Sequence, residues 1–279
     1  MILYPLLAML SNVIGIVVDK FALSRQKIQL DVFKVTLFLL LCLFTAIFLP
    51  FLGSINITKA LTPTYLIIFG LMLVTAIVWN IFYYQGIQKE KLYEFQTIIT
   101  FTPLVTILLA SLLFIEERKW QVELAAIIAS LALIFAHVRK SHFQISQYSA
   151  GLIICVILTS LELILIKVLL NVYSPVSLYF LRTLIIFIFF ALWYRPNLNN
   201  LPKSGLALIA ASAVMGAAQM ILKFYGFEFF GVVYTVMVMT LGPILVYLSC
   251  FLIFKEELKK RTILAALVIL ACIVWATFQ

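Results

Sequence analysis

The chain has 279 residues and a formal net charge of +9, and 65% of its residues are hydrophobic while only 11% are charged. With a mean hydropathy of +1.17, this composition excludes an ordinary soluble globular protein. The basic residues occur singly or in small groups between apolar runs, without the basic stripe that nucleic-acid binding needs. We therefore expect the lipid bilayer, and no nucleic acid, as a partner.

Long apolar runs recur along the whole chain, each of roughly 17 to 23 residues, which is the length that a helix needs to cross about 30 Å of hydrocarbon. Polar segments separate the runs, and the weakest divide is the short link from Gly226 to Gly231. The pattern predicts an all-α integral membrane protein with ten transmembrane helices. In chain order they span Ile2–Val18, Val32–Leu52, Tyr65–Ile87, Phe95–Ile115, Val122–Val138, Gly151–Val172, Val176–Trp193, Leu206–Phe227, Val232–Phe254 and Ile263–Phe278.

Two segments of the chain repeat each other. Thr100–Ala126 aligns without a gap to Thr240–Ala266, and 11 of 27 positions are identical. The shared residues include Pro103 with Pro243, Glu116 with Glu256, and Glu117 with Glu257. We interpret the chain as a duplication of five spans, with halves 1–140 and 141–279 inside one membrane domain. Because five is odd, the halves enter the membrane from opposite sides, and such inverted repeats are typical of secondary transporters.

With these features the chain resembles the EamA-type members of the drug/metabolite transporter superfamily over essentially its whole length. The resemblance rests on the ten spans in two halves, on the two proline-containing spans that end in acidic pairs, and on SPVSLYFLR, which opens the seventh span and contains Arg182. The arginine usual at the start of the second span is replaced here by Lys34 in DVFKVTLF. The resemblance implies a central cavity lined by spans 1, 3, 6 and 8, and it identifies the fold better than the substrate.

The distribution of basic residues predicts the orientation, because cytoplasmic loops are enriched in Lys and Arg. The loops after spans 1, 3, 5, 7 and 9 contain twelve such residues: Arg25, Lys27, Lys89, Lys91, Arg139, Lys140, Arg195, Lys203, Lys255, Lys259, Lys260 and Arg261. The opposite loops contain three: Lys59, Arg118 and Lys119. Both termini are therefore expected on the side away from the cytoplasm.

Polar residues deep in spans are costly in hydrocarbon and usually face the bundle interior. Three polar stripes recur at helical spacing on spans 1, 3 and 8: Ser11, Asn12, Gly15 and Asp19; Trp79, Asn80, Tyr83 and Tyr84; Gly216, Gln219 and Lys223. We expect the stripes to converge on one cavity. The predicted substrate-binding residues are Asn12, Trp79, Asn80, Tyr83, Tyr84, Glu162, Gln219 and Lys223.

Several of these positions have a second interpretation. Asn12 could join two helices by hydrogen bonding, and the aromatic residues could form a belt at a membrane surface. Lys223 could extend its ammonium group to the interface.

The two prolines and the acidic pairs have structural interpretations as well. Pro103 and Pro243 each predict a kink, which serves either as a hinge or as a fixed bend. The acidic pairs at the ends of these spans are expected to be structural, because basic residues flank them.

Glu162 stands near the middle of the apolar stretch LTSLELILIKVLL. We expect it to lie in the cavity and to couple transport to protons or to a cationic substrate group. Lys167 is five residues on, about 140° around the helix, so the partner must come from another span, with Lys223 and Arg182 as candidates. The position also resembles the midspan glutamate of small multidrug resistance proteins. The alternative is a static ion pair that fixes two spans together.

No GxxxxGK[ST], HExxH or GxSxG motif is present, so we expect no catalytic residues, cofactor or metal and do not expect an enzyme. The favoured hypothesis is a transporter in the cell membrane, the cytoplasmic membrane in a prokaryote, exporting small organic metabolites such as amino acids. The second hypothesis for the substrate is an organic anion or a sugar phosphate, because of the basic residues Lys223, Arg182 and Lys167. A membrane-embedded enzyme or a lipid-handling protein is a third hypothesis, and it would need converging reactive groups. The sequence leaves the oligomeric state open.

Overall fold

The computed structural model describes residues 3–25, 28–90, 95, 98–115, 119–137, 147–197, 201–254 and 260–277. This described part is built from helices, and an isolated bridge joins Ile55 to Tyr173. The named elements are α1 (Leu3–Lys20), the π-helix η1 (Phe21–Arg25), α2 (Leu30–Leu52), α3 (Ile57–Ala60), α4 (Pro63–Lys89), α6 (Thr102–Leu113), α7 (Trp120–His137), α8 (Gln147–Leu169), α9 (Pro175–Tyr194), α10 (Lys203–Met239), α11 (Leu241–Phe254) and α12 (Lys260–Thr277).

Six helical stretches in the described ranges are long and apolar enough to cross a membrane, by length and composition. They are Leu3–Leu23, Leu30–Leu52, Pro63–Lys89, Ala150–Leu169, Pro175–Tyr194 and Lys203–Val246. The outer surface of the bundle is apolar as well, with Phe51 82% exposed and Trp193 71% exposed. Large side chains of this kind lose nothing when they face lipid, whereas in water they would form an adhesive surface. These features are those of a multi-pass membrane protein.

The stretch from Lys203 to Val246 has 44 residues, which would extend about 66 Å as a straight helix, twice the thickness of the hydrocarbon. It reverses direction at Gly231, which has φ 80° and ψ 172°, a conformation that only glycine adopts readily. Gly226 allows the close approach behind the reversal, because a Cβ there would lie 2.7 Å from a methyl carbon of Thr235. The link predicted between Gly226 and Gly231 is therefore a tight helical reversal.

Each of the two repeated prolines follows an interruption of its helix. Thr100 and Phe101 form a turn before α6, where Pro103 is the second residue, and Thr240 forms the turn between α10 and α11, which contains Pro243. Because a proline cannot donate the hydrogen bond of a continuous helix, a break just before it is expected. The hinge role of both residues stays a prediction. The acidic pairs Glu116–Glu117 and Glu256–Glu257 lie outside the described residues.

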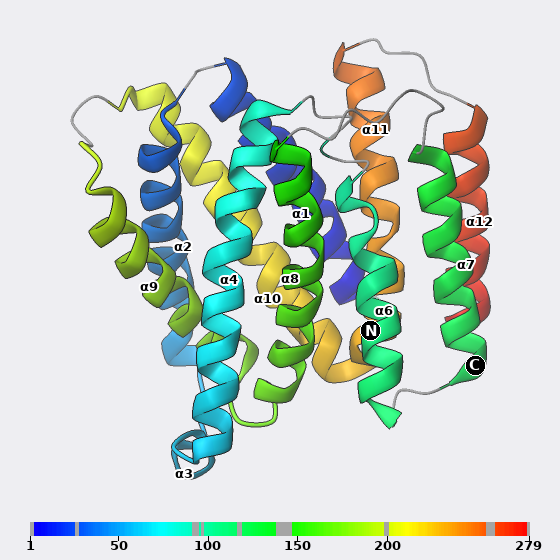
Figure 1. Ribbon diagram of the computed structural model, residues 1–279, viewed down its shortest axis with the longest axis horizontal. Helices are drawn as coiled ribbons and strands as arrows, with labels where there is room; N and C mark the ends of the chain where they lie inside the picture. The colour runs from blue at the N-terminus through cyan, green and yellow to red at the C-terminus, as the bar shows by residue number, and fades with distance from the viewer. Residues whose placement is uncertain are drawn as a thin grey trace.

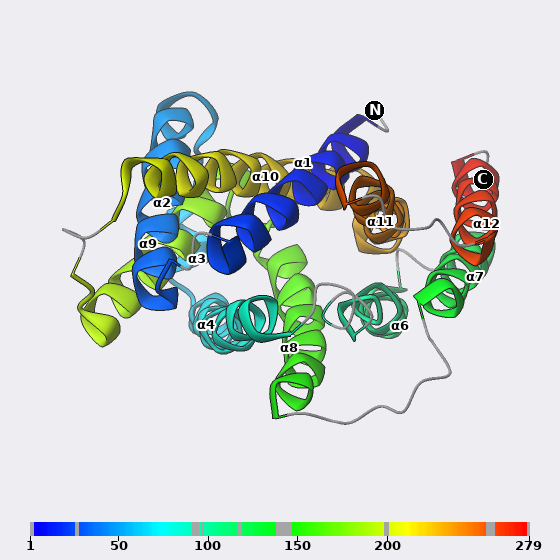
Figure 2. The ribbon, with the colours of Figure 1, turned by 90° about the horizontal axis from the view of Figure 1, so that it is seen from above.

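The helices pack mainly in pairs, each formed by one helix from before residue 140 and one from after it. The most extensive pairs are α1 with α10, α4 with α8, α2 with α9, and α7 with α12 (Figure 1). Seen from above, α1 and α10 lie on one side, α4 and α8 lie on the other, and the α7–α12 pair stands at the edge (Figure 2). The space between the first two pairs contains the site described next.

Candidate functional site

A central cavity of about 230 Å³ is lined by residues of α1, α2, α4, α6, α8, α9, α10 and α11. Its lining includes all eight residues predicted to bind substrate, together with both prolines: Asn12, Trp79, Asn80, Tyr83, Tyr84, Glu162, Gln219, Lys223, Pro103 and Pro243. Residues of all three predicted stripes therefore meet at this cavity, although Ser11 of the first stripe is not among its lining residues. The volume is below the roughly 300 to 1,000 Å³ of pockets for drug-sized ligands, so it suits a small solute.

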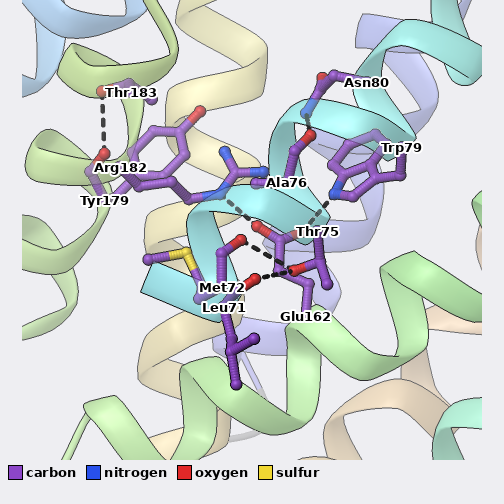
Figure 3. Close-up of polar contacts among 10 residues, drawn as sticks. All are labelled: Leu71, Met72, Thr75, Ala76, Trp79, Asn80, Glu162, Tyr179, Arg182 and Thr183. Carbon is purple, nitrogen blue, oxygen red and sulfur yellow. Dashed lines mark hydrogen bonds and ion pairs between the residues drawn. The ribbon is translucent and has the colours of Figure 1, made fainter. Parts of the chain in front are cut away.

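Glu162 is held in a buried ion pair. Its Oε1 lies 2.5 Å from Nε of Arg182 on α9, and the two side chains are only 1% and 3% exposed. The Nε1–H of Trp79 on α4 donates to Oε2 of the same carboxylate at 2.5 Å (Figure 3). Of the two candidate partners, Arg182 is thus the one that bonds to Glu162, and the carboxylate links three helices. Its coupling role stays a prediction.

An aromatic wall surrounds this ion pair. Tyr83 packs edge-on against both Trp79 and Tyr84, with ring centroids 5.6 and 5.2 Å apart. The guanidinium carbon of Arg182 lies 5.8 Å from the centre of the Trp79 ring and 6.0 Å from that of Tyr179, within the range of cation–π attraction. Because these rings line the cavity, they do not form the alternative belt at a membrane surface.

Amide side chains supply polar contacts to the cavity. The Nδ2 of Asn80, which is 2% exposed, donates to the carbonyl oxygen of Ala76 at 2.7 Å (Figure 3). Asn12 and Gln219 are half-buried and make no side-chain hydrogen bond within the described part of the chain. Amides left open in this way are suited to a polar solute, because a bound ligand can satisfy them.

Lys223 is buried among the lining residues with 8% exposure. It is within electrostatic range of both Glu162 and Arg182. Among the described residues its ammonium group has no hydrogen-bond partner. It therefore faces the cavity and does not extend to the membrane surface, the alternative left open by its sequence position.

The structure adds a second carboxylate that the predicted site did not include. Asp19, at the end of α1, is 6% exposed and accepts a hydrogen bond from Oγ of Ser212 on α10. Both residues line the cavity. Asp19 belonged to the first polar stripe, and Ser212 lies four residues before Gly216, so extending the stripe of span 8 by one turn would have added Ser212 to the candidate residues without indicating its bond to Asp19.

Two other basic residues lie apart from the cavity lining. The Nζ of Lys34 lies 3.4 Å from Oη of Tyr194 and 5.4 Å from the centres of the Phe190 and Tyr194 rings. The Nζ of Lys167 donates to the carbonyl oxygen of Phe227 at 2.6 Å and borders a separate hollow of about 860 Å³ near the reversal of α10. The sequence offered Lys167 as one of three cations for an organic anion, but this residue does not line the central cavity.

Comparison with known proteins finds a family that part of the chain resembles. Residues 148–278, from α8 to α12, match the model of the EamA-like transporter family. The second half of the chain therefore resembles the EamA-like transporter family. The matched segment contains the cavity's ionic groups on α8, α9 and α10, which are Glu162, Arg182 and Lys223, and also Ser212, the serine that bonds to Asp19.

The fold of the chain is also found in a solved crystal structure. The two superpose with a TM-score of 0.68 over 97% of this chain and 96% of the other, at 14% sequence identity. At that identity the likeness concerns the fold alone. None of the curated proteins matches the chain significantly.

Proposed function

We propose that the protein is a secondary active transporter that exports small organic metabolites such as amino acids by alternating access. The observation that carries the proposal is the central cavity, because eight polar or aromatic residues selected from the sequence meet there, drawn from both halves of the chain. The match of residues 148–278 to a family of transporters supports the same class. The substrate then occupies the space between the α1–α10 and α4–α8 pairs.

Ten spans arranged as two inverted repeats are part of the proposal. In this scheme α10 and α11 together supply spans 8 and 9, which meet at Gly231. Support comes from four of the helix pairs, which map onto helix pairs in contact when each span is exchanged for its counterpart five spans later. Under that exchange the α1–α10 pair becomes α8–α4, the α6–α8 pair becomes α11–α1, and the α2–α9 and α7–α12 pairs map onto themselves. A rocking motion between two such pairs would expose the cavity on alternate sides.

The charges of the cavity favour a substrate with one carboxylate. Arg182 is neutralised by Glu162, which leaves Lys223 as the ammonium group available to an anion among the described lining residues. A phosphate carries about −1.5 to −2 charges at neutral pH and would be poorly balanced by one lysine, whereas a carboxylate would be matched. The wall of Trp79 and Tyr83 suits an apolar or aromatic body. An aromatic amino acid such as phenylalanine meets both requirements.

The other hypotheses have less support. A sugar-phosphate exchanger would need a second free cation, and Lys167 lies at a different hollow. A membrane enzyme would need an activated nucleophile. Cys155 contacts Thr159, with Sγ 3.8 Å from Oγ1, and the described lining contains no histidine that could act as a base.

A counterflow assay tests the proposed function. Proteoliposomes of the purified chain are loaded with unlabelled L-phenylalanine, and the transient uptake of labelled L-phenylalanine is compared with uptake into protein-free vesicles. Parallel vesicles contain uridine or glucose 6-phosphate with the matching label. We expect counterflow for the amino acid and little for the other two. Uptake equal to that of protein-free vesicles for every solute would refute a transporter of these classes.

The proposed orientation has its own test. C-terminal fusions to a phosphatase that is active only outside the cytoplasm, and to a fluorescent protein that folds only inside it, report the side of the C-terminus. We expect phosphatase activity without fluorescence. Twelve of the fifteen basic loop residues lie in the loops after spans 1, 3, 5, 7 and 9, on the side of the membrane opposite to the C-terminus. Strong fluorescence with a silent phosphatase would reverse the orientation.

A further inference from the structure

The central cavity contains two buried carboxylates, and they differ in their partners. Glu162 has a guanidinium group and an indole N–H as donors. Asp19 has the hydroxyl of Ser212, and within the described residues it has no cationic partner. A buried carboxylate without a counter-charge is unfavourable, and such a group neutralises itself by taking up a proton.

We propose that Asp19, bonded to Ser212, is the proton-binding site that couples transport in this protein. Glu162 then serves as a positioning residue that orients Arg182 and Trp79. The inference rests on the proposed transport function and departs from the expectation that Glu162 carries the coupling proton. In each cycle Asp19 takes up a proton from one side of the membrane and releases it on the other.

The groups around Asp19 agree with this assignment. From α10 the facing group is Ser212, and from α4 the phenol groups of Tyr83 and Tyr84 are within electrostatic range. The segment Leu241–Phe254 of α11 contains no charged residue. In η1 the one charged residue is Arg25, whose side chain lies outside the described set.

The neighbouring cation on α1 is engaged elsewhere. The Nζ of Lys20 donates to the carbonyl oxygens of Ile87 and Glu90, at 2.7 and 2.9 Å. These carbonyls belong to the C-terminal end of α4, where helical carbonyls lack partners of their own. Lys20 therefore caps α4 and leaves Asp19 without a counter-charge, even though the two residues are adjacent in sequence.

The ligand of Asp19 is a proton and not a metal ion. Hard metal ions such as Ca²⁺ take six to eight oxygen ligands, roughly, whereas Asp19 has one hydroxyl beside it. No group of three or more metal-ligating side chains occurs in the described ranges. A carboxyl group with a serine hydroxyl can remain hydrogen-bonded in both protonation states, because a hydroxyl both donates and accepts.

The ligand is also distinct from the substrate's own amino group. Ser212 and Lys223 are eleven residues apart on α10, which places them about 16 Å apart along the helix axis. In an α-amino acid the ammonium and carboxylate groups share one carbon atom. A substrate whose carboxylate binds at Lys223 therefore leaves Asp19 unoccupied. The π-helix Phe21–Arg25 begins two residues after Asp19, and π-helical turns are frequent at functional sites.

Infrared spectroscopy of the reconstituted full chain tests proton binding without a substrate. The wild type should show the C=O band of a protonated carboxyl group that disappears as the pH is raised. Asp19→Asn should abolish this band, and Glu162→Gln should retain it. A wild type without the band, a band that survives in Asp19→Asn, or its loss in Glu162→Gln would overturn the proposal.

Carbodiimide labelling provides a second measurement that needs no variant. The reagent modifies protonated carboxyl groups in apolar surroundings, and mass spectrometry of the wild-type protein locates the adduct. We expect an adduct on the peptide containing Asp19 that is lost as the pH rises, and none on the peptide containing Glu162. Labelling confined to Glu162, or absent from both, would contradict the assignment.

A transport measurement then separates this inference from the proposed function. Uptake of L-phenylalanine is measured with vesicles that are acidic inside and with vesicles that have no gradient. For an exporter that exchanges its solute for protons, the ratio should exceed one severalfold in the wild type and in Glu228→Gln, which changes an exposed carboxylate outside the cavity lining, and it should fall to one in Asp19→Asn. Counterflow in the wild type without a gradient effect would overturn only the proton site. Absence of counterflow would overturn the transport function itself.

Discussion

The regions around Glu162 and Asp19 solve the same physical problem in different ways. Both place a carboxylate in the interior of a membrane bundle, with exposures of 1% and 6%. The first is balanced by the guanidinium of Arg182, whereas the second has a neutral hydroxyl beside it. A carboxylate bonded to a cation is a fixed structural element, while a carboxylate without a counter-charge can respond to proton uptake. The difference teaches that burial alone does not identify a coupling residue.

The largest expected effect comes from breaking the ion pair. Arg182→Leu leaves Glu162 buried without a cation and should lower the free energy of unfolding by about 3 to 5 kcal/mol. Thermal unfolding in detergent micelles measures this loss, with the exposed Lys203→Met as the matched control. The double variant Glu162→Leu/Arg182→Leu should recover most of the stability. If Arg182→Leu is as stable as the wild type, the pair is not the structural element described here.

The next effect concerns the cation that remains available to substrate. Lys223→Met removes a charge-assisted contact to the substrate carboxylate, a loss of about 2 kcal/mol or roughly 30-fold in affinity. The half-saturation concentration for L-phenylalanine counterflow checks it, and Lys59→Gln, at an exposed position, is the control. An unchanged affinity would place the carboxylate elsewhere in the cavity.

Smaller effects are expected at the amides. Asn80→Ala and Gln219→Leu should each weaken counterflow by about 1 kcal/mol, roughly fivefold, because each removes a neutral hydrogen bond to the solute. The amount of folded protein, followed by size-exclusion chromatography, should not change. Unfolding of both variants would instead assign these amides to helix packing.

The smallest effect tests the Asp19 side of the comparison. Ser212→Ala removes a single hydroxyl donor and should lower the free energy of unfolding by about 1 kcal/mol, well below the loss in Arg182→Leu. The same thermal assay applies to both variants. A loss as large as that of Arg182→Leu would mean that Asp19 is as firmly compensated as Glu162.

Hydropathy and polar spacing were sufficient to predict several features of the fold and of the candidate site. They predicted the helical, multi-span character, the reversal near Gly231 and the residues that face the cavity. These features follow from local length and periodicity, because an apolar helix in lipid must turn its polar side chains inward.

The partners of the two carboxylates could not be derived in this way. Glu162 and Arg182 lie on helices that diverge from a short connection (Figure 1), so their pairing depends on an interhelical angle that no sequence period encodes. Asp19 and Ser212 are 193 residues apart, and a serine in a run of small residues gives little signal by itself. Hydrogen bonding across helices is set by tertiary packing.

The contact that Lys20 makes with α4 has a consequence for the motion of the bundle. Asp19 and Ser212 lie within the α1–α10 pair, while α1 and α4 touch over only a few residues, and Lys20 bridges them through the carbonyl oxygens of Ile87 and Glu90. If the two pairs move apart, the contact between Lys20 and the end of α4 must break. Breaking this contact exchanges two carbonyl contacts for water, a step on the order of 1 to 3 kcal/mol.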